Sequence, residues 1–201
     1  MPLPDPPADF ERLLDAILDE PARREELSAQ LHATYAQRKA ILVLDMCGFT
    51  RTTQQHGIVA FLLMIRRMRR ICEPCFAEHG GKLIKAEADN LFYTFASASE
   101  AVAAALEAQR RIAAGNHDAA PEEHIFCAIG IGFGEVLCLG GTDLHGHEVN
   151  LASKLGEDIA SDGQILLTSG AHAALDDAAL PMRGAMVLIS GLELSYHEVL
   201  R

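Results

Sequence analysis

Apolar residues recur at helical spacing through the first part of the chain. Residues 8–37 carry one apolar stripe before Pro21 and another after it, which predicts two amphipathic helices joined at that proline. The stripes consist of Phe10, Leu13, Leu14, Ile17 and Leu18, then of Leu27, Leu31 and Tyr35. Residues 1–7 are rich in proline and favour a disordered start. The helical pair could pack on its own domain, or it could couple to a partner or to a second copy.

From residue 38 onward the hydrophobic pattern alternates between strands and helices. Pro74 is expected to kink or restart the second long helix, and Ser97 with Glu100 forms a capping box before the third. The predicted elements, in order, are a strand at 40–45, a helix at 56–77, a hairpin at 82–86 and 90–95, a helix at 98–114, a strand at 124–132 that glycines break and that returns at 136–139, a helix at 148–160, a strand at 165–167 and a closing hairpin at 187–189 and 195–199.

This order of elements predicts the fold class. A β-α-β-β-α-β sequence with later elements favours an α+β protein with a ferredoxin-like core, a mixed sheet and helices on one face. Residues 1–37 are interpreted as a disordered start with a helical extension, and residues 38–201 as one domain.

Composition narrows the class of protein further. A net charge of −11 argues against a nucleic-acid surface, and the four arginines between Arg66 and Arg70 are interpreted as a solvated helix face. No apolar run approaches the roughly 20 residues that span a bilayer. The five cysteines are scattered, so a disulfide framework is not expected, and the lone pair Cys72 and Cys75 lacks partners for a zinc site. These features predict a cytoplasmic protein without a membrane or nucleic-acid partner.

Two aspartates stand at positions that suit a metal and a polyphosphate. Asp45 closes an apolar strand and precedes a loop that contains Gly48, and Asp89 lies in the turn of the predicted hairpin. Hard cations such as Mg²⁺ or Mn²⁺ prefer oxygen ligands, and phosphates bind backbone N–H groups. Aspartate is also a common turn residue, so the alternative is two structural turns.

Several segments, in order along the chain, resemble the catalytic domains of class III nucleotidyl cyclases. The run from Asp45 to Thr50 resembles the D-x-x-G-F-T signature of that family. The other matching segments are Gly80 to Asp89, Gly130 to Val136, Asp143 to Leu155 and Gly163 to Thr168. The resemblance covers roughly residues 38–200 and implies the cyclase fold.

The resemblance implies a metal and phosphate site. Asp45 and Asp89 would hold two divalent ions per site, Mg²⁺ or Mn²⁺, with the carbonyl of Met46 as a further ligand. The phosphates would lie against the amides of a loop that consists of Cys47, Gly48, Phe49 and Thr50. No histidine or glutamate occupies a motif position suited to a general base, so deprotonation assisted by the metal is favoured.

The resemblance also implies a substrate. Lys85 matches the lysine that donates to the adenine ring in adenylate cyclases, and Asp143 matches the residue that accepts from the adenine amino group. A donor and an acceptor in these places favour ATP over GTP. Asn150 and Lys154 match residues that act on the transition state.

Family sites form between two chains, which implies a homodimer with shared active sites. Asp45, Lys85 and Asp89 would come from one subunit, and the partner subunit would supply Asp143, Asn150 and Lys154. A regulatory partner could act through residues 8–37.

Three positions depart from the family pattern. Lys154 replaces an arginine and loses its forked donor geometry, Ser190 replaces a phosphate-binding lysine, and Ala88 replaces a glycine beside Glu87. Alanine suits position 88 only if its φ is negative. Arg183 or Lys82 could supply the missing cation.

The leading hypothesis is an adenylate cyclase that forms 3′,5′-cyclic AMP and pyrophosphate. The alternatives are a catalytically weak or inactive cyclase-homology module that binds nucleotide or dimerises, and a cyclase with another base preference. Three other residues are candidates for chemistry. His145 and His147 are interpreted as solvated loop histidines and Cys47 as a small residue that faces the core, ahead of metal, proton or redox roles.

Overall fold

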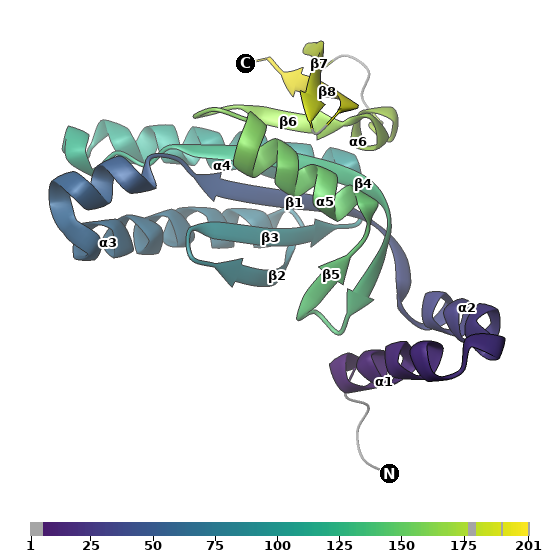
Figure 1. Cartoon of the computed structure of the whole chain (residues 1–201). Coiled ribbons are helices and arrows are strands. Elements are labelled where there is room, and N and C mark those ends of the chain that lie inside the picture. The colour runs from purple at the N-terminus through teal and green to yellow at the C-terminus, as the bar shows by residue number, and fades with distance from the viewer. Residues whose placement is uncertain (1–5, 177–179, 190, 201) are drawn as a thin grey trace.

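The computed structural model describes residues 6–176, 180–189 and 191–200, without the side chains of residues 6, 49–52, 55, 189 and 192. An eight-stranded mixed sheet forms the centre of the molecule, with the strand order β2-β3-β1-β4-β6-β8-β7 and with β5 attached to β4 (Figure 1). The strands are β1 (Ala36–Met46), β2 (Lys82–Glu87), β3 (Asn90–Phe95), β4 (Cys127–Leu139), β5 (Asp143–His145), β6 (Ile165–Thr168), β7 (Met182–Ile189) and β8 (Leu192–Val199).

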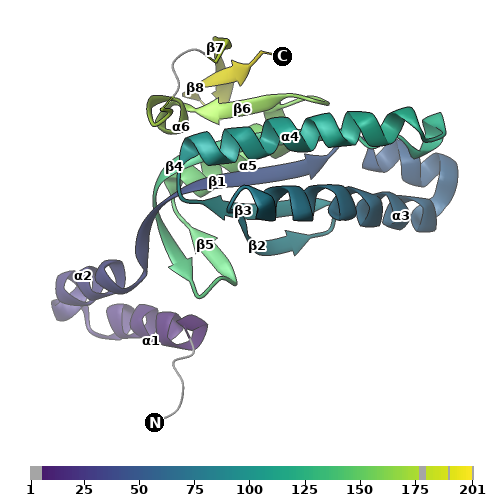
Figure 2. The same ribbon diagram turned by 180° about the vertical axis from the view of Figure 1, so that it is seen from behind.

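Helices cover both faces of the sheet. The long helices α3 and α4 lie on one face, and α5 with the π-helical segment η3 lies on the other (Figures 1 and 2). The expectation of helices on one face was wrong, because α5 and η3 pack on the second face. The helical segments are α1 (Pro6–Asp19), η1 (Pro21–Arg23), α2 (Arg24–Tyr35), α3 (Phe49–Glu78), α4 (Ala98–His117), η2 (Pro121–Glu123), α5 (His147–Ser153), η3 (Lys154–Ile159) and α6 (Ser169–Ala173).

The predicted ferredoxin-like core is confirmed. The elements β1, α3, β2, β3, α4 and β4 follow one another in the chain, and the four strands lie in the order β4-β1-β3-β2 with antiparallel neighbours. The later strand β6 adds to β4 in the parallel direction, which makes the sheet mixed. The fold class is therefore α+β, as the order of hydrophobic segments predicted.

Strand β1 is apolar without interruption because both of its faces are covered. Residues on one face, such as Leu42 and Leu44, lie in the core beneath α3 and α4. Ile41 and Val43, on the other face, lie in the core beneath α5. Successive side chains of a strand point to opposite faces, so a continuous apolar run is what a doubly covered strand requires.

Strand β4 is continuous, although its glycines were expected to break it. It runs unbroken from Cys127 to Leu139. A Cβ at Gly130 would lie 2.1 Å from the carbonyl oxygen of Ala152 and 2.5 Å from the amide of Gly156. The absence of a side chain therefore lets the backbone of α5 and η3 lie directly against the strand, a known use of strand glycine.

Helix α3 begins earlier than predicted and bends at a different residue. It starts at Phe49, directly after Gly48, and continues through Pro74 to Glu78. The residue with non-helical dihedral angles is Gly57, with φ 80° and ψ 170°. Left-handed φ values suit glycine, so Gly57 rather than Pro74 supplies the break.

The two predicted N-terminal helices are confirmed as α1 and α2, which meet at Pro21. They project beside the β4–β5 hairpin (Figure 2). Their apolar stripes form a small cluster in which Phe10, Leu31 and Tyr35 pack with Leu139 of β4. Among the described residues, no helix has the length and apolar character needed to cross a bilayer.

Candidate active site

The fold brings the two predicted metal aspartates to one end of the sheet. Asp45 is the penultimate residue of β1, and Asp89 lies in the two-residue turn between β2 and β3. Strands β1 and β3 pair antiparallel with Leu44 opposite Leu91, so the β2–β3 turn lies near the end of β1 that carries Asp45. Two carboxylates that are far apart in sequence therefore become neighbours.

Burial disfavours the charged form of both carboxylates, and the charge of Asp89 adds to this effect at Asp45. Burial, followed by the charges of Asp89 and Glu157, raises the pKa of Asp45 from the ordinary 3.8 to about 7. Burial also raises the pKa of Asp89. A divalent cation would relieve both the desolvation and the repulsion, so this pair fits a metal site.

Among the described residues, few side chains are placed to bind a metal ion. In the part of the chain that the structure describes, no group of three or more His, Cys, Asp or Glu side chains is arranged to hold a metal ion. Met46 is buried at the end of β1, and its amide donates to the Asp45 carboxylate. Mg²⁺ commonly uses one or two carboxylates and takes its other ligands from phosphates and water, which matches a set of two aspartates.

The predicted phosphate loop is only partly available for phosphate. The amide of Cys47 donates to the carbonyl of Phe126 at 2.8 Å, so it does not point to a ligand as expected. Gly48, with φ 94°, is the N-cap of α3, and the backbones of Phe49 and Thr50 form its first turn. Amides of a first helical turn lack partners within the helix and favour anions, so the phosphate candidates are the amides from Gly48 to Thr50. The side chains of Phe49 and Thr50 lie outside the described part of the chain.

The cysteines favour the structural interpretation. Burial and the nearby Asp45 charge raise the pKa of the Cys47 thiol to about 11. Burial raises the pKa of the Cys72 thiol to about 12, and Cys75 is buried beside it. A thiol that stays protonated near neutral pH is a poor nucleophile and a poor metal ligand, which argues against redox or zinc chemistry at these positions.

Lys85 and Asp143, the predicted base-binding residues, contact each other. The Lys85 ammonium lies 3.1 Å from Asp143 Oδ1 and 3.3 Å from Glu87 Oε1, and 4.9 Å above the centre of the Phe92 ring. Burial alone would lower the pKa of Lys85, but its hydrogen bonds to Asp143 and Glu87 raise it. The pair thus presents a fixed donor and a fixed acceptor side by side.

The same pairing keeps Asp143 ionised. Burial would raise the pKa of Asp143, but the amide of Leu144, the Lys85 ammonium and His145 together hold it below its ordinary value. An ionised carboxylate only accepts hydrogen bonds, which is the role that the resemblance implies.

The expected division of the site between two subunits is revised for Lys85. Lys85 and Asp143 pair within one chain, so both must face the same site. Asp143 precedes α5, which carries Asn150, in the same chain. We therefore expect Lys85 to act with Asp143, Asn150 and Lys154, in place of the predicted grouping with the metal aspartates.

The two predicted transition-state residues lie on α5 and η3. Asn150 is exposed on α5, and Lys154 begins the π-helical segment η3. Lys154 Nζ forms an ion pair with Asp158 at 2.5 Å, on a side chain that is 40% exposed. Exposed pairs at this spacing contribute only about 0.3–0.5 kcal/mol, so the lysine can leave its partner for an anion.

Ala88 adopts the conformation that was expected to be unsuitable for alanine. Its φ is +50°, in the left-handed region, where an L side chain costs roughly 1–2 kcal/mol. Its carbonyl accepts a hydrogen bond from Arg69 Nη2 at 3.0 Å. The turn that carries Asp89 is therefore strained and is held from α3 by Arg69.

Sequence reasoning missed several residues that join distant elements, among them Arg69 and Glu148 beside the candidate site. Arg69 and Arg67 belong to the cluster interpreted as a solvated face, yet both donate to backbone carbonyls. Glu148 accepts from the Phe133 amide at 3.1 Å and from Thr168 Oγ1 at 2.6 Å, which ties α5 to β4 and β6. A charge run contains no signal for such carbonyl contacts, because they depend on the partner elements.

The proposed substitutes for the missing phosphate cation lie away from the Asp89 turn in this chain. Arg183 is on β7, the edge strand at the other side of the sheet from β2, and it pairs with Glu198. Lys82 begins β2, at the end of that strand opposite to the Asp89 turn. Ser190 lies outside the described residues.

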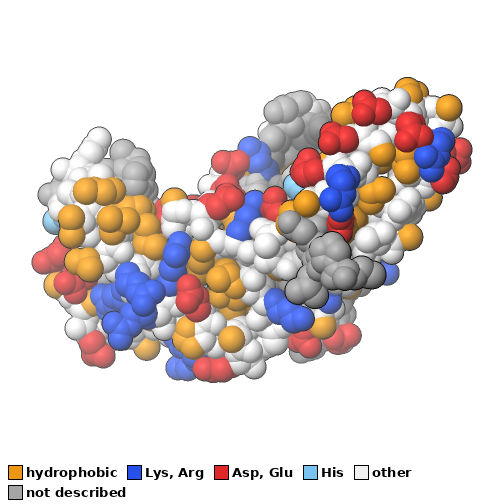
Figure 3. Space-filling view, turned by 90° about the horizontal axis from the view of Figure 1, so that it is seen from below, with side chains coloured by type: hydrophobic (Ala, Val, Ile, Leu, Met, Phe, Trp, Pro, Cys, Tyr) orange, Lys and Arg blue, Asp and Glu red, His pale blue; other side chains and the backbone are white. Residues whose placement is uncertain are grey.

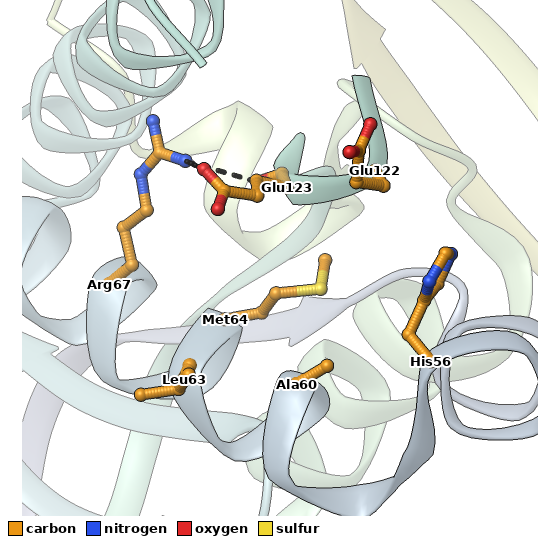
Figure 4. Close-up of a pocket in the computed structure, with 7 residues that line it drawn as sticks. All are labelled: His56, Ala60, Leu63, Met64, Arg67, Glu122 and Glu123. Carbon is orange, nitrogen blue, oxygen red and sulfur yellow. Dashed lines mark hydrogen bonds and ion pairs between the residues drawn. The ribbon is translucent and has the colours of Figure 1, made fainter. Parts of the chain in front are cut away.

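A separate hollow lies between α3 and η2. It has a volume of about 270 Å³ and is lined by apolar side chains between Arg67 and His56 (Figure 4). Met64 points into it, and Arg67 donates to the Glu123 carbonyl at 3.1 Å. None of the predicted site residues is among those that line it.

Two elements carry exposed apolar side chains. Ile58, Val59, Leu62 and Leu63 of α3 are each more than half exposed, as are Met186 and Leu188 of β7. Seen from below, hydrophobic side chains gather at the end of the molecule formed by α3, beside Lys and Arg side chains (Figure 3). Apolar patches of this kind commonly mark interaction surfaces.

Comparison with known proteins shows that this chain is similar to nucleotide cyclases. No family model matches the chain. A curated protein of Rhizobium meliloti (strain 1021), named "Putative adenylate cyclase 3", is 29% identical over 133 residues. The match spans 66% of this chain and 22% of that protein's length.

Solved structures show the same fold. A crystal structure of an adenylate/guanylate cyclase/hydrolase from Silicibacter pomeroyi has a TM-score of 0.72 and 26% identity, and the match covers 83% of this chain and 98% of that chain. The adenylyl cyclase CyaB from P. aeruginosa has a TM-score of 0.67 at 19% identity, covering 83% and 96% of the two chains. The guanylyl cyclase Cya2 has a TM-score of 0.70 at 20% identity, covering 82% and 92%.

The strain at Ala88 generates a first prediction. Ala88→Gly removes a steric cost of roughly 1–2 kcal/mol and adds an entropic cost of about 0.5–1 kcal/mol, so we expect a net gain in unfolding free energy of about 0.5–1 kcal/mol. Urea denaturation measures the change. Ala86→Gly, within β2, is the matched control and should lower stability. Equal effects at the two positions would contradict the strained turn.

The raised pKa of Asp45 generates a second prediction, for the metal-free protein. Because the pKa in the folded state, about 7, exceeds the ordinary 3.8, the stabilisation from the bound proton is complete below pH 3.8 and is lost as pH rises through 7. Asp45→Asn should therefore stabilise the fold at pH 8.5, by on the order of 1 kcal/mol after allowance for solvent screening.

Thermal unfolding in the presence of a chelator measures this difference at pH 5 and at pH 8.5. The gain from Asp45→Asn should grow with pH, whereas Asp15→Asn, on the exposed side of α1, should give no such trend. A gain that is equal at both pH values would contradict the raised pKa.

Proposed function

This chain contains a class III nucleotidyl cyclase catalytic domain, and on that premise we propose that it converts ATP to 3′,5′-cyclic AMP and pyrophosphate. In this reaction the ribose 3′-oxygen forms a bond to the α-phosphorus, and the bond from that phosphorus to the leaving pyrophosphate oxygen breaks. The proton of the 3′-hydroxyl passes to solvent.

The observation that carries the choice of ATP is the contact between Lys85 and Asp143. Adenine offers a ring nitrogen that accepts and an amino group that donates, which match an ammonium and an ionised carboxylate held 3.1 Å apart. Guanine presents the reverse pattern on that edge and would offer neither charged group a complementary partner. A site built to hydrogen-bond one base discriminates against a base that cannot form those bonds.

The carboxylates of Asp45 and Asp89 would hold the divalent ions, Mg²⁺ or Mn²⁺. When bound, two such ions supply charge stabilisation for the leaving pyrophosphate and lower the pKa of the attacking hydroxyl. The residues of this chain position these ions, because Arg69 fixes the turn that carries Asp89 and the end of β1 fixes Asp45. The Gly48 to Thr50 amides, at the start of α3, bind the phosphates.

Asn150 and Lys154 complete the site from the partner subunit of a homodimer. Asn150 is exposed on α5 and so is available to a second copy. Asn150 orients the ribose, and Lys154 offsets charge on the phosphates as the new bond forms. Lysine lacks the forked geometry of arginine, so we expect slower turnover than an arginine would give.

A second copy also accounts for the exposed apolar side chains. Val59 and Leu63 on α3, and Met186 and Leu188 on β7, are each more than 60% exposed in the single chain. An isologous interface would bury the same patch on both subunits. The dimer would then contain two equivalent sites, each with metal aspartates from one chain and the base-binding pair from the other.

The decisive experiment measures cyclic AMP formed from ATP by the purified chain, with Mg²⁺ and with Mn²⁺. Asp45→Asn should abolish the metal-dependent product, and Asp143→Ala should raise the KM for ATP and reduce discrimination against GTP. Circular dichroism should confirm that both variants fold. Absence of product at concentrations that give dimers would favour a module that binds nucleotide or dimerises without turnover.

Mixing inactive variants tests how the site is shared. Asp45→Asn mixed with Asn150→Ala should regain about a quarter of the wild-type activity, because half of the dimers are mixed and each has one intact site. Asp45→Asn mixed with Lys85→Ala should recover in the same way. Lys85→Ala mixed with Asn150→Ala should also recover if Lys85 acts with the metal aspartates, and this recovery would contradict the revised division.

A further inference from the structure

The first helix of the chain contacts the strand that carries the base-binding aspartate. Phe10 of α1 is buried, with 5% of its surface exposed. Its ring stacks on the ring of His145, with centroids 5.6 Å apart and an interplanar angle of 11°. Tyr35 meets the same Phe10 ring edge-on at 5.2 Å, so the position of Phe10 is fixed from both sides.

His145 connects this contact to the candidate active site. Its Nε2 atom lies 3.7 Å from Asp143 Oδ2, and the other carboxylate oxygen of Asp143 lies 3.1 Å from Lys85 Nζ. A continuous series of contacts therefore runs from α1 through β5 to the pair that is proposed to bind adenine. The sequence analysis interpreted His145 as a solvated loop residue and did not predict this connection.

Strand β5 depends on support from outside the main sheet. It has three residues and pairs with β4 alone among the described strands. Leu144 points into the core beneath α5, whereas its neighbours Asp143 and His145 lie on the opposite side of the strand. On this side of β5, Lys85 of β2 contacts Asp143 and Phe10 of α1 packs on His145.

Packing matters more than charge in the contact between His145 and Asp143. The His145 side chain is 49% exposed and that of Asp143 is 38% exposed, so solvent screens their electrostatic interaction. An aromatic pair is worth roughly 0.5–1.5 kcal/mol beyond the area that it buries. The ring of His145, held against Phe10, therefore restrains Asp143 on its second oxygen, while Lys85 and the Leu144 amide hold the first.

We propose that Phe10 and His145 are positioning residues for Asp143, so that docking of the α1–α2 hairpin sets the affinity and base preference of the nucleotide site. This inference rests on the proposed function, in which Asp143 binds the adenine amino group. A partner that removed α1 from β5 would lower ATP affinity without contact to Asp45 or Asp89. The N-terminal hairpin thus becomes a control element for substrate binding.

The test uses the full chain and compares KM and kcat for ATP. Phe10→Ala and His145→Ala should each raise the KM by about three- to tenfold, the equivalent of the lost aromatic pair, and should leave kcat within about twofold. His145→Phe keeps a ring against Phe10 and should restore a KM near that of the wild type. A general loss of structure would instead lower kcat and would not be rescued.

Two controls separate the Phe10 contact from the hairpin as a whole. His32→Ala removes an exposed contact from α2 to Glu135 of β4, 3.4 Å long, and should leave the KM unchanged. His147→Ala removes the neighbouring exposed histidine and should also leave it unchanged. Equal increases in KM for His32→Ala and Phe10→Ala would overturn the role of the ring contact.

Amide hydrogen exchange gives a readout that does not need turnover. Phe10→Ala should speed exchange in residues 143–145 and leave that of residues 41–44 in β1 unchanged; unchanged exchange in β5 overturns the inference. The dissociation constant for ATP separates the two proposals. If Asp143→Ala weakens ATP binding and Phe10→Ala does not, the inference fails while the proposed function stands, whereas no ATP binding by the wild type overturns the function itself.

Discussion

The direct approach of helix backbone to strand backbone is the contact on which the rest of the site depends. Gly130 of β4 faces Gly156 of η3 and the Ala152 carbonyl of α5, and a single Cβ at Gly130 would lie 2.1 Å from that oxygen. Because no side chain separates these elements, α5 and η3 lie close to β1 and bring Glu157 near Asp45. Glu148 then fixes the first turn of α5 through Phe133 and Thr168. These contacts fix the position of the exposed Asn150 relative to the sheet.

The candidate site lowers the stability of the fold. Two carboxylates are brought together at the end of β1, where burial raises the pKa of both and the charge of Asp89 further raises that of Asp45. The turn beside them contains an alanine with positive φ, restrained by a hydrogen bond from Arg69. Local strain and unfavourable charge of this kind typically concentrate where a protein binds a ligand, because the ligand supplies the compensating interaction. The stable core around β1 makes such a site tolerable.

The base-binding pair and the metal pair differ in how they are stabilised. Lys85 and Asp143 have opposite charges, so they stabilise each other within one chain before any nucleotide is present. Asp45 and Asp89 have like charges and gain only when a cation binds. The first pair is therefore pre-organised and suited to selecting a base. The metal pair depends on its ions. Of the two pairs, the base-binding pair is the one connected to the α1–α2 hairpin, through His145.

The sequence by itself determined the order of elements and the identity of the chemical groups. The continuous apolar run at 41–44, the capping box at Ser97 and the helical stripes around Pro21 arise from local periodicity, which is a property of the chain alone. Asp45 and Asp89 were identified from their positions at strand ends and from the resemblance to nucleotidyl cyclases, and Lys85 and Asp143 from that resemblance alone.

Only the tertiary structure decided which of these groups meet. The Cys47 amide donates to the Phe126 carbonyl, and Lys85 pairs with Asp143. His145 stacks on Phe10, which belongs to the N-terminal helix α1. The glycines of β4 looked like strand breaks because sequence alone does not reveal that another backbone packs against them. Such contacts join residues far apart in the chain, and local periodicity carries no information about them.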